Sequence, residues 1–323
     1  MMVRIGLYTA ALLGLLVSWA LWFAPITVGS WLYAQNARIE AVLAGLSEHT
    51  LEMDGVGWRY YARHETQPGP CVVLIHGFTA EASNWFRMAM RLDKGRCLIV
   101  ADLPGFGQTK TPSGLSYRIP IQSQRLHRLL SAVRPTGAFD LVGSSMGGHI
   151  ALRMALDTPY RIRSLVLMDA GGVTSPQPSE QDQRVLAGDR NAFDIHHPAE
   201  FEAFLHLGMN KVPWMPTSVR DALAATFIAR NAHHQEIFTQ IYHHDLEDTR
   251  LGQLRMPVLV IWGDQDNLLH TSMANVFHRG ISGSRLVVMP GIGHLPMMEA
   301  PSATASTLEQ FWNGLEPPSQ PAQ

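Results

Sequence analysis

Charged residues are scarce in this sequence of 323 residues. Asp, Glu, Lys and Arg together make up 16%, against about 25% in an average soluble protein. The 25 basic and 27 acidic side chains give a net charge of −2, so the chain lacks the basic excess that neutralises the phosphates of a nucleic acid. Hydrophobic residues make up 46%, which is enough for a large packed core. The composition argues against a disordered chain and against a nucleic-acid-binding protein, and it favours contact with a membrane or an apolar ligand.

Cysteine is rarer still, since the chain contains only Cys71 and Cys97. Two cysteines exclude a disulfide-rich scaffold and a cysteine-rich zinc site. Histidine is more frequent, and some histidines stand in adjacent pairs: His196-His197, His233-His234 and His243-His244. Adjacent histidines rarely point the same way, and no cysteine or carboxylate cluster nearby completes a ligand set. We therefore expect no metal site.

A long uncharged run stands near the N-terminus. No charged residue occurs between Arg4 and Arg38, and Ile5–Ile26 is an uncharged run of 22 residues that is mostly apolar. As a helix this run would extend about 33 Å, enough to cross a bilayer core of about 30 Å. Secretory signal peptides have a shorter apolar core and an A-x-A-like cleavage site, which is not evident here. We predict an uncleaved membrane anchor over residues 1–30, with a cleaved signal peptide or a buried core helix as the alternatives.

The flanks of this run predict its orientation. Arg4 and the amino terminus precede it, whereas the charge of Arg38 is offset by Glu40. Positive charge favours the cytoplasmic side, so the main domain should lie outside, in the periplasm if the anchor is in a bacterial inner membrane. Aromatic residues typical of a membrane interface gather at the other end: Trp19, Trp22, Phe23, Trp31 and Tyr33.

An amphipathic helix is expected next, over residues 31–49. Ile39, Val42, Leu43 and Leu46 fall at helical spacing on one face. Such a stripe could lie on the membrane surface or pack on the domain, and packing is the commoner reason for one.

The rest of the chain alternates short apolar runs with helical patterns. The runs are Leu51–Met53, Val56–Ala62, Cys71–Ile75, Cys97–Ala101, Phe139–Val142, Ser164–Met168, Pro257–Trp262 and Arg285–Met289. Runs that are apolar throughout and separated by helices indicate strands buried on both faces of a parallel sheet. We predict an α/β fold with a mostly parallel central sheet flanked by helices, built from residues 50–170 and 255–316. Residues 171–254, helical with proline breaks, form an inserted lid, and residues 317–323 a flexible tail.

A Gly-x-Ser-x-Gly pattern, residues 143–147, stands between a predicted strand and a predicted helix. The pattern alone is weak, but this context is that of a nucleophile elbow, in which the serine projects from a sharp turn at the top of the sheet. The glycine positions need small residues, because the backbone is strained and its neighbours pack closely. Ser145 is the candidate nucleophile, and an ordinary glycine-rich turn is the alternative.

A serine hydroxyl needs a base to become nucleophilic. His294 follows the last predicted strand, and Asp264 and Asp266 follow the strand before it. The chain order serine, acid, histidine is the one expected with such an elbow. We prefer Asp266 because of its spacing after the strand, and we interpret Asp264 as a loop residue. In this hypothesis His294 takes the Ser145 proton and Asp266 orients the imidazole.

An oxyanion hole requires two backbone N–H groups. One belongs to the residue after the nucleophile, Met146, and the other to the loop after an earlier strand, here residues 76–79. We expect Phe78 to supply the second donor, and we interpret His76 as a structural residue of that loop.

Five landmarks, HGF, DLPGFG, GSSMGG, WGDQD and GIGH, occur in one order along the chain. On these motifs the chain resembles the α/β-hydrolase superfamily over about residues 50–315. HGFTAEASNW, LVGSSMGG and IWGDQDNLL make it most similar to membrane-anchored monoacylglycerol lipases of the α/β-hydrolase-domain class and to bacterial family V lipases. The resemblance implies hydrolysis of acylglycerols or similar lipid esters. Serine at the nucleophile position argues against dehalogenases and epoxide hydrolases, which use aspartate there.

Within the lid, apolar residues at helical spacing, with a tryptophan nearby, are candidates for an acyl-chain groove; the alternative is that they form the lid's own core. They are Phe201, Phe204, Leu205, Met209 and Trp214. Cys71 and Cys97 fall in strands that are neighbours in this fold, so a disulfide is conceivable in a periplasmic domain. We favour two buried free thiols, because cross-strand disulfide geometry is strained.

Together these features predict a membrane-anchored serine hydrolase that needs no cofactor and whose partners are a lipid ester and the bilayer. Two alternatives stay open. One is a hydrolase that cleaves a carbon–carbon bond in a ring-fission diketone, which would need polar or basic groups in its pocket for a diacid. The other is a non-catalytic hydrolase-fold receptor for a small apolar ligand, which would show no turnover.

Overall fold

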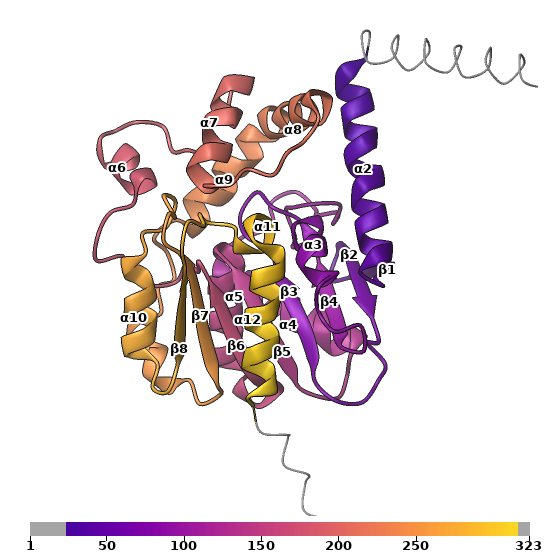
Figure 1. The fold of residues 1–323 in the computed structure, drawn as a ribbon, viewed down its shortest axis with the longest axis vertical. Helices are drawn as coiled ribbons and strands as arrows, with labels where there is room; N and C mark the ends of the chain where they lie inside the picture. Colours follow the sequence, from indigo (N-terminus) through magenta and orange to yellow (C-terminus); the bar gives the residue numbers. More distant parts are fainter. Residues whose placement is uncertain (1–23, 316–323) are drawn as a thin grey trace, which may run out of the picture.

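The computed structural model describes residues 24–315, which form an eight-stranded sheet with helices on both faces (Figure 1). The strands are β1 (Ser47–Met53), β2 (Val56–Arg63), β3 (Cys71–Ile75), β4 (Cys97–Ala101), β5 (Phe139–Ser144), β6 (Ile162–Met168), β7 (Val258–Gly263) and β8 (Arg285–Met289). Their order across the sheet is β1-β2-β4-β3-β5-β6-β7-β8. The pairs β1–β2 and β2–β4 are antiparallel and all other neighbours are parallel. The predicted strands and the mostly parallel sheet are confirmed.

Helices that precede, separate and follow the strands cover the sheet. They are α2 (Pro25–Leu43), α3 (Phe86–Ala89), α4 (Ile119–Val133), α5 (Met146–Asp157), α10 (Ser272–Gly280), α11 (Pro296–Glu299) and α12 (Pro301–Asn313). Side chains of the central strands alternate between two apolar cores, one on each face. In β3, Val73 and Ile75 pack with α4, α5 and α10, whereas Val72 and Leu74 pack with α2, α3 and α12. Burial on both faces explains why β3 is apolar at every position.

Four helices lie between β6 and β7 in the chain, at one end of the sheet (Figure 1). They are α6 (Glu180–Leu186), α7 (Pro198–Gly208), α8 (Thr217–Ala229) and α9 (Asn231–Ile241). Helices α7 and α8 pack around a small apolar core that is separate from the two cores of the sheet, formed by Ile195, Phe201, Leu205, Met209 and Ala224. The helical character expected for residues 171–254 is therefore present.

Helix α2 differs at both ends from the helix expected over residues 31–49. It begins earlier because Pro25, in its first turn, is well suited to start a helix. It ends at Leu43 because Gly45 takes a left-handed conformation, with φ of +73°. The Leu46 N–H then donates to the Ala41 carbonyl (2.9 Å), which is the Schellman pattern of a helix end.

Three side chains of the predicted apolar stripe face solvent. Ile39, Val42 and Leu43 are 59%, 74% and 58% exposed, and only Leu46 is buried. The expectation that this stripe packs on the domain is therefore wrong for those three residues. Helix α2 packs elsewhere, since Gly29 approaches α8 so closely that a Cβ atom would lie 1.8 Å from its backbone.

The predicted membrane span, residues 5–26, lies almost wholly outside the described residues, as do Trp19, Trp22 and Phe23. Within residues 24–315, no helix is long and apolar enough to cross a bilayer. Of the two aromatic residues that follow the span, Trp31 is exposed. The hydroxyl of Tyr33 instead donates to Glu81 of the domain (2.9 Å).

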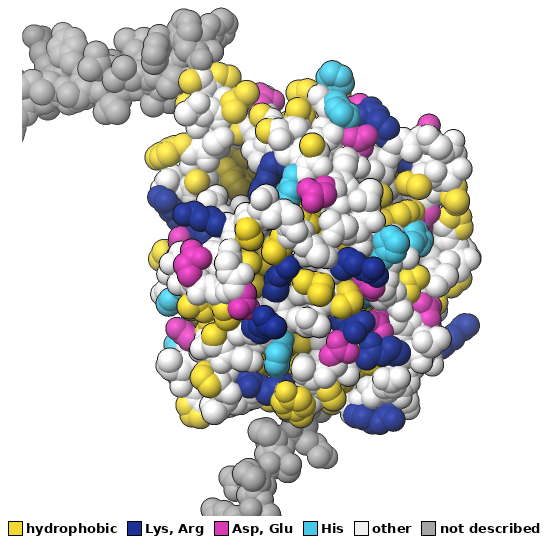
Figure 2. Space-filling model, turned by 180° about the vertical axis from the view of Figure 1, so that it is seen from behind, with side chains coloured by type: hydrophobic (Ala, Val, Ile, Leu, Met, Phe, Trp, Pro, Cys, Tyr) yellow, Lys and Arg dark blue, Asp and Glu magenta, His cyan; other side chains and the backbone are white. Residues whose placement is uncertain are grey.

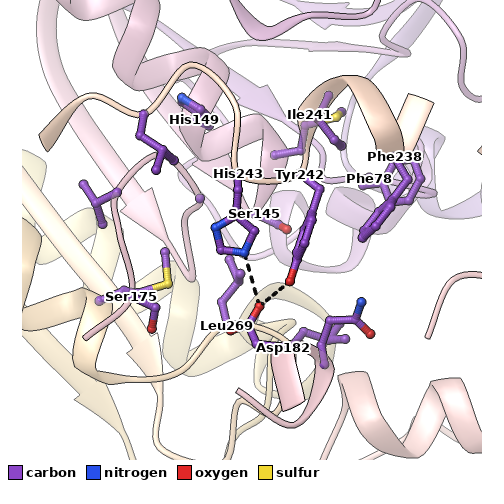
Figure 3. A pocket seen from close by; sticks show the side chains of 18 of the residues that line it. Phe78, Ser145, His149, Ser175, Asp182, Phe238, Ile241, Tyr242, His243 and Leu269 are labelled. Atoms are coloured by element: carbon purple, nitrogen blue, oxygen red, sulfur yellow. Dashed lines mark hydrogen bonds and ion pairs between the residues drawn. The ribbon is translucent and has the colours of Figure 1, made fainter. Parts of the chain in front are cut away.

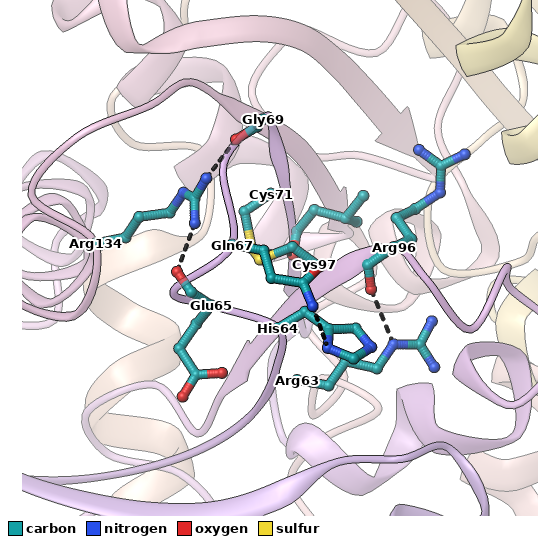
Figure 4. The surroundings of a disulfide bond; sticks show 10 residues. Arg63, His64, Glu65, Gln67, Gly69, Cys71, Arg96, Cys97 and Arg134 are labelled. Atoms are coloured by element: carbon teal, nitrogen blue, oxygen red, sulfur yellow. Dashed lines mark hydrogen bonds between the residues drawn. A yellow bond between two sulfur atoms is a disulfide. The ribbon is translucent and has the colours of Figure 1, made fainter.

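A disulfide joins Cys71 and Cys97, so the preference for free thiols is wrong (Figure 4). The two residues open β3 and β4 and are partners in the parallel register, with their Cα atoms 4.7 Å apart. That separation lies within the range that a disulfide spans. Beside it, Arg134 donates to the Gly69 carbonyl and holds the segment that leads into β3.

Candidate active site

Ser145 follows directly on β5, in the middle of the sheet, and caps the N-terminus of α5. Its φ of +55° lies in a region that non-glycine residues rarely adopt. Two backbone hydrogen bonds hold this conformation, one from Ser145 N to the Met168 carbonyl (3.1 Å) and one from Gly171 N to the Ser145 carbonyl (3.0 Å). Strain that the surroundings hold in this way is typical of functional positions.

The glycines of the Gly-x-Ser-x-Gly pattern have no room for a side chain. A Cβ atom on Gly143 would lie 2.2 Å from the Gly147 carbonyl oxygen, and one on Gly147 would lie 2.2 Å from that of Ile75. A Cβ atom on Gly77, in the loop after β3, would lie 3.0 Å from the Ser145 Cβ. The turn therefore has the tight geometry expected of a nucleophile elbow.

His294 and Asp266 come together in the loops that follow β8 and β7. The His294 Nδ1–H donates to Asp266 Oδ2 (2.7 Å), and both residues are about 5% exposed or less. The N–H groups of Leu268 and Leu269 donate to Asp266 Oδ1 (2.9 and 3.0 Å), which orients the carboxylate. This arrangement leaves the Nε2 atom of His294 free to act as a base.

Asp264, the alternative acid, points elsewhere and accepts a hydrogen bond from Gly291 N (2.7 Å). The two loops can meet because Gly263 lies against Gly293: a Cβ atom there would be 2.1 Å from the Gly293 carbonyl oxygen. The His294 N–H donates to the Gly208 carbonyl at the end of α7 (2.9 Å). The inserted helices thus help to hold the histidine loop.

The two expected oxyanion donors lie in suitable segments. Met146 is the first residue of α5, and Phe78 belongs to the loop after β3. Neither N–H has a hydrogen-bond partner within the part of the chain that the structure describes. His76 stabilises the Phe78 loop, because its Nε2 accepts from Leu103 N (2.9 Å) and its Nδ1–H donates to the Gly77 carbonyl (2.8 Å). Burial lowers the pKa of His76 to about 4, so it stays neutral and structural.

A third carboxyl group, Asp169, lies beside Asp266 and His294, and the sequence analysis missed it. It is wholly buried, and its Oδ1 accepts from Gly263 N (2.8 Å). Burial, and then the charge of Asp266, raise its pKa well above the ordinary value. The three groups lie within 4.8 Å of one another, close enough to share a cation; the direct bond between His294 and Asp266 fits a hydrogen-bonded arrangement better. An aspartate directly after a buried strand, β6, is the signal that could have indicated it.

A pocket opens at Ser145 and His294, between the sheet and the inserted helices (Figure 3). Its apolar wall includes Phe78, Ile119, Phe193, Phe238, Leu268 and Leu269. Phe78 packs edge-on against Phe193, with ring centres 4.9 Å apart. Polar side chains also line it, among them Gln181, Asp182, Tyr242 and His243.

The five lid residues proposed from the sequence are not on this wall. Phe201, Leu205 and Met209 lie in the core of the inserted helices, where Phe204 packs against them. Trp214 is 83% exposed. Phe193, in the loop before α7, and Phe238, on α9, take the place expected for these residues beside the nucleophile. Only the i, i+4 spacing of Phe238 and Tyr242 was available in the sequence to indicate this wall.

Comparison with known proteins adds a family and relatives. A family model described as alpha/beta hydrolase fold matches residues 70–301. Lipase 1 of Psychrobacter immobilis is 32% identical over 259 residues, which cover 79% of this chain and 81% of that protein. Monoacylglycerol lipase abhd6-B of Xenopus laevis is 26% identical over 326 residues, which cover 96% of this chain and 94% of that protein. The crystal structure of a bacterial membrane phospholipase A superposes with a TM-score of 0.83 and 30% identity, covering 96% of this chain and 98% of that one.

Proposed function

The chain belongs to the α/β-hydrolase family, and from this membership we propose that it is a membrane-anchored serine hydrolase that cleaves carboxylic esters of lipids, above all acylglycerols. Its likeness to proteins named lipases supports ester hydrolysis. One observation supports the proposal of a serine hydrolase in particular: Ser145 and His294 line the same pocket, and His294 is hydrogen-bonded to the buried Asp266.

In the proposed mechanism Ser145 Oγ attacks the ester carbonyl while His294 Nε2 takes its proton. Asp266 holds the imidazole by its Nδ1–H and stabilises the cation that forms. The N–H groups of Phe78 and Met146 donate to the oxyanion, and losing one such donor costs about 3–4 kcal/mol of transition-state stabilisation. The leaving alcohol takes the proton from His294. Water, deprotonated by the same imidazole, then releases the fatty acid from Ser145.

The pocket favours an acyl chain over a charged diketone. Phe193, Phe238 and Ile119 give the chain an apolar wall. A ring-fission diketone carries carboxylate groups, yet no lysine or arginine occurs among the described residues that line the pocket. Carbon–carbon bond hydrolysis therefore lacks the basic groups that it would need.

Membrane attachment rests on two features at the N-terminal side. Residues 5–26 carry no charge, and the exposed face of α2 presents Ile39, Val42 and Leu43. Figure 2 shows hydrophobic side chains at the surface where the described chain begins. We propose that the first segment spans a bacterial inner membrane and that α2 rests on its surface, with the domain in the periplasm. A disulfide between Cys71 and Cys97 fits an oxidising compartment.

The test of catalysis is fatty-acid release from a medium-chain monoacylglycerol by the detergent-solubilised full-length protein. Ser145→Ala should lower the rate to below about 1% of wild type, because the chemistry is lost with the nucleophile. Ser144→Ala is the matched control. The Ser144 hydroxyl is buried and has no hydrogen-bond partner among the described residues, so the activity of this variant should stay near that of wild type. Serine-independent release, or none from a folded protein, would refute the proposal.

The test of anchoring is deletion of residues 2–23, which leaves the contact of Gly29 with α8 in place. The shortened protein should leave the membrane fraction and still hydrolyse a short soluble ester. If the shortened protein stays on membranes and is released only when Val42→Glu is added, the exposed face of α2 is a second anchor. Retention that survives both changes would contradict the proposed mode of attachment.

A further inference from the structure

Part of the pocket wall is polar, and the proposed mechanism does not use it. Asp182 of α6 lies there, and its Oδ1 accepts a hydrogen bond from the Tyr242 hydroxyl (2.8 Å). The Nε2 atom of His243 lies 3.5 Å from the same oxygen (Figure 3). The N–H and the hydroxyl of Ser179 both donate to Oδ2 (2.9 Å each). These contacts hold the carboxylate in one orientation beside the cavity.

A buried amide stands next to this carboxylate. Gln181 lines the same pocket and is only 3% exposed. Its Oε1 accepts from Ala192 N (2.7 Å), whereas its Nε2 has no hydrogen-bond partner among residues 24–315. An unsatisfied buried donor is unfavourable, and an acceptor on a bound molecule would remove that penalty.

The wall carries one negative charge and no fixed positive charge. Burial raises the pKa of Asp182, but hydrogen bonds from His243, Ser179 and Tyr242 outweigh burial and lower it to about 2. Asp182 is the one carboxylate among the described lining residues, and none of them is lysine or arginine. His149, also on the wall, stays neutral because burial lowers its pKa to about 4. A bound anion would therefore face a carboxylate, with no lysine or arginine on the described wall to bind the anion instead.

We propose that Asp182 and Gln181 form a headgroup subsite, which accepts esters of an uncharged polyol and rejects esters that carry a phosphate at that place. The inference rests on ester hydrolysis at Ser145 and names the substrate class of that site. A polyol hydroxyl can donate to Asp182 Oδ1, which has a single short hydrogen bond, and a polyol oxygen can accept from Gln181 Nε2. A doubly ionised phosphate has no proton to donate to Asp182, and its charge is repelled there.

The test compares two esters that differ only in the phosphate, 1-decanoylglycerol and 1-decanoylglycerol 3-phosphate. Decanoate release is measured with the full-length protein in uncharged detergent, and kcat/KM is determined for each ester. Wild type should favour the glycerol ester by about tenfold or more, the effect of about 1.4 kcal/mol of repulsion. Asp182→Asn keeps an oxygen acceptor and removes the charge, so it should reduce this preference by about fivefold or more. The ratio within one variant does not depend on the folded fraction.

Asp189→Asn is the matched control, because Asp189 is an exposed aspartate just after α6 and is not on the pocket wall; the preference should stay as in wild type. If Asp182→Asn has no turnover, His243→Arg takes its place: the His243 side chain is 53% exposed, and arginine there would neutralise Asp182 and reduce the preference. Equal kcat/KM values for the two esters in wild type would overturn the subsite. So would an unchanged ratio of the two values in whichever variant, Asp182→Asn or His243→Arg, is active. Absence of Ser145-dependent release from both esters would instead refute the proposed function.

Discussion

Replacing Asp169 with asparagine should raise the free energy of unfolding, and the gain should grow with pH. Asp169 is wholly buried, and an oxygen of its carboxyl group lies within 4.8 Å of Asp266 and His294. Its Oδ2 atom has no hydrogen-bond partner in the described part of the chain. Asparagine has nearly the same shape, keeps an acceptor for Gly263 N and offers an N–H donor to Asp266.

The magnitude follows from proton binding. Burial, and then the charge of Asp266, raise the pKa of Asp169 well above the ordinary aspartate value of 3.8. Below pH 3.8 the Asp169 carboxyl is protonated in both the folded and the unfolded chain, so its titration does not lower the stability of wild type. Above it the unfolded carboxyl ionises while the folded one keeps its proton. Wild type then loses about 1.4 kcal/mol of stability per pH unit, until the pH reaches the folded pKa. Asparagine does not titrate and avoids this loss.

Urea unfolding followed by tryptophan fluorescence, in detergent and from about pH 4 to pH 7, measures the effect. The difference between Asp169→Asn and wild type should widen as the pH rises above about 4, by up to about 1.4 kcal/mol per pH unit, and should level off where the pH passes the folded pKa of Asp169. The exposed Asp189 supplies the control, since Asp189→Asn should give a difference that does not change with pH. A pH-independent difference for Asp169→Asn would refute the reasoning, because it would mean that the folded protein holds Asp169 with an ordinary pKa.

Two further predictions concern the acid and the disulfide. Asp266→Asn should lower kcat by up to about 10⁴, because it removes the charge that orients and stabilises His294. Asp264 instead accepts a hydrogen bond from Gly291 N, so Asp264→Asn should lower kcat far less. A larger loss of kcat from Asp264→Asn in steady-state kinetics would exchange the roles of the two residues. Replacing Cys71 and Cys97 together by alanine should lower the free energy of unfolding by about 3.5 kcal/mol, since the disulfide closes a loop of 26 residues. Wild type unfolded with reductant should match the double variant, and a difference between the two would contradict this explanation.

The sheet and the elbow could be predicted because each imposes a strict local requirement. A strand buried on both faces needs an apolar residue at every position, so Cys71–Ile75 and Cys97–Ala101 are visible as continuous runs. Gly143 and Gly147 have carbonyl groups where a Cβ atom would stand, so their spacing around Ser145 is a direct consequence of the turn. The order of Ser145, Asp266 and His294 in the chain then follows from the order of the strands.

Features that depend on what lies opposite a residue could not be predicted in the same way. Helical spacing shows that Ile39, Val42 and Leu43 share a side of α2, but it does not show whether protein, solvent or lipid covers that side. The pairing of Cys71 with Cys97 depends on the register of two parallel strands, and a shift by one residue would separate them. General knowledge of strained geometry therefore pointed to free thiols, although the register places the two residues as partners.

The inserted helices show the same difficulty at the substrate site. Helices α7 and α8 of the insertion bury an apolar core between them, and Phe201, Leu205 and Met209 contribute to it with regular helical spacing. The strongest periodic signal in residues 171–254 therefore marks the packing of the segment on itself. The pocket at Ser145 is instead lined by Phe193, a loop residue without periodicity, and by Phe238 of α9. Residues that bind substrate in such an insertion are therefore better sought among the apolar positions that the periodic core leaves unused.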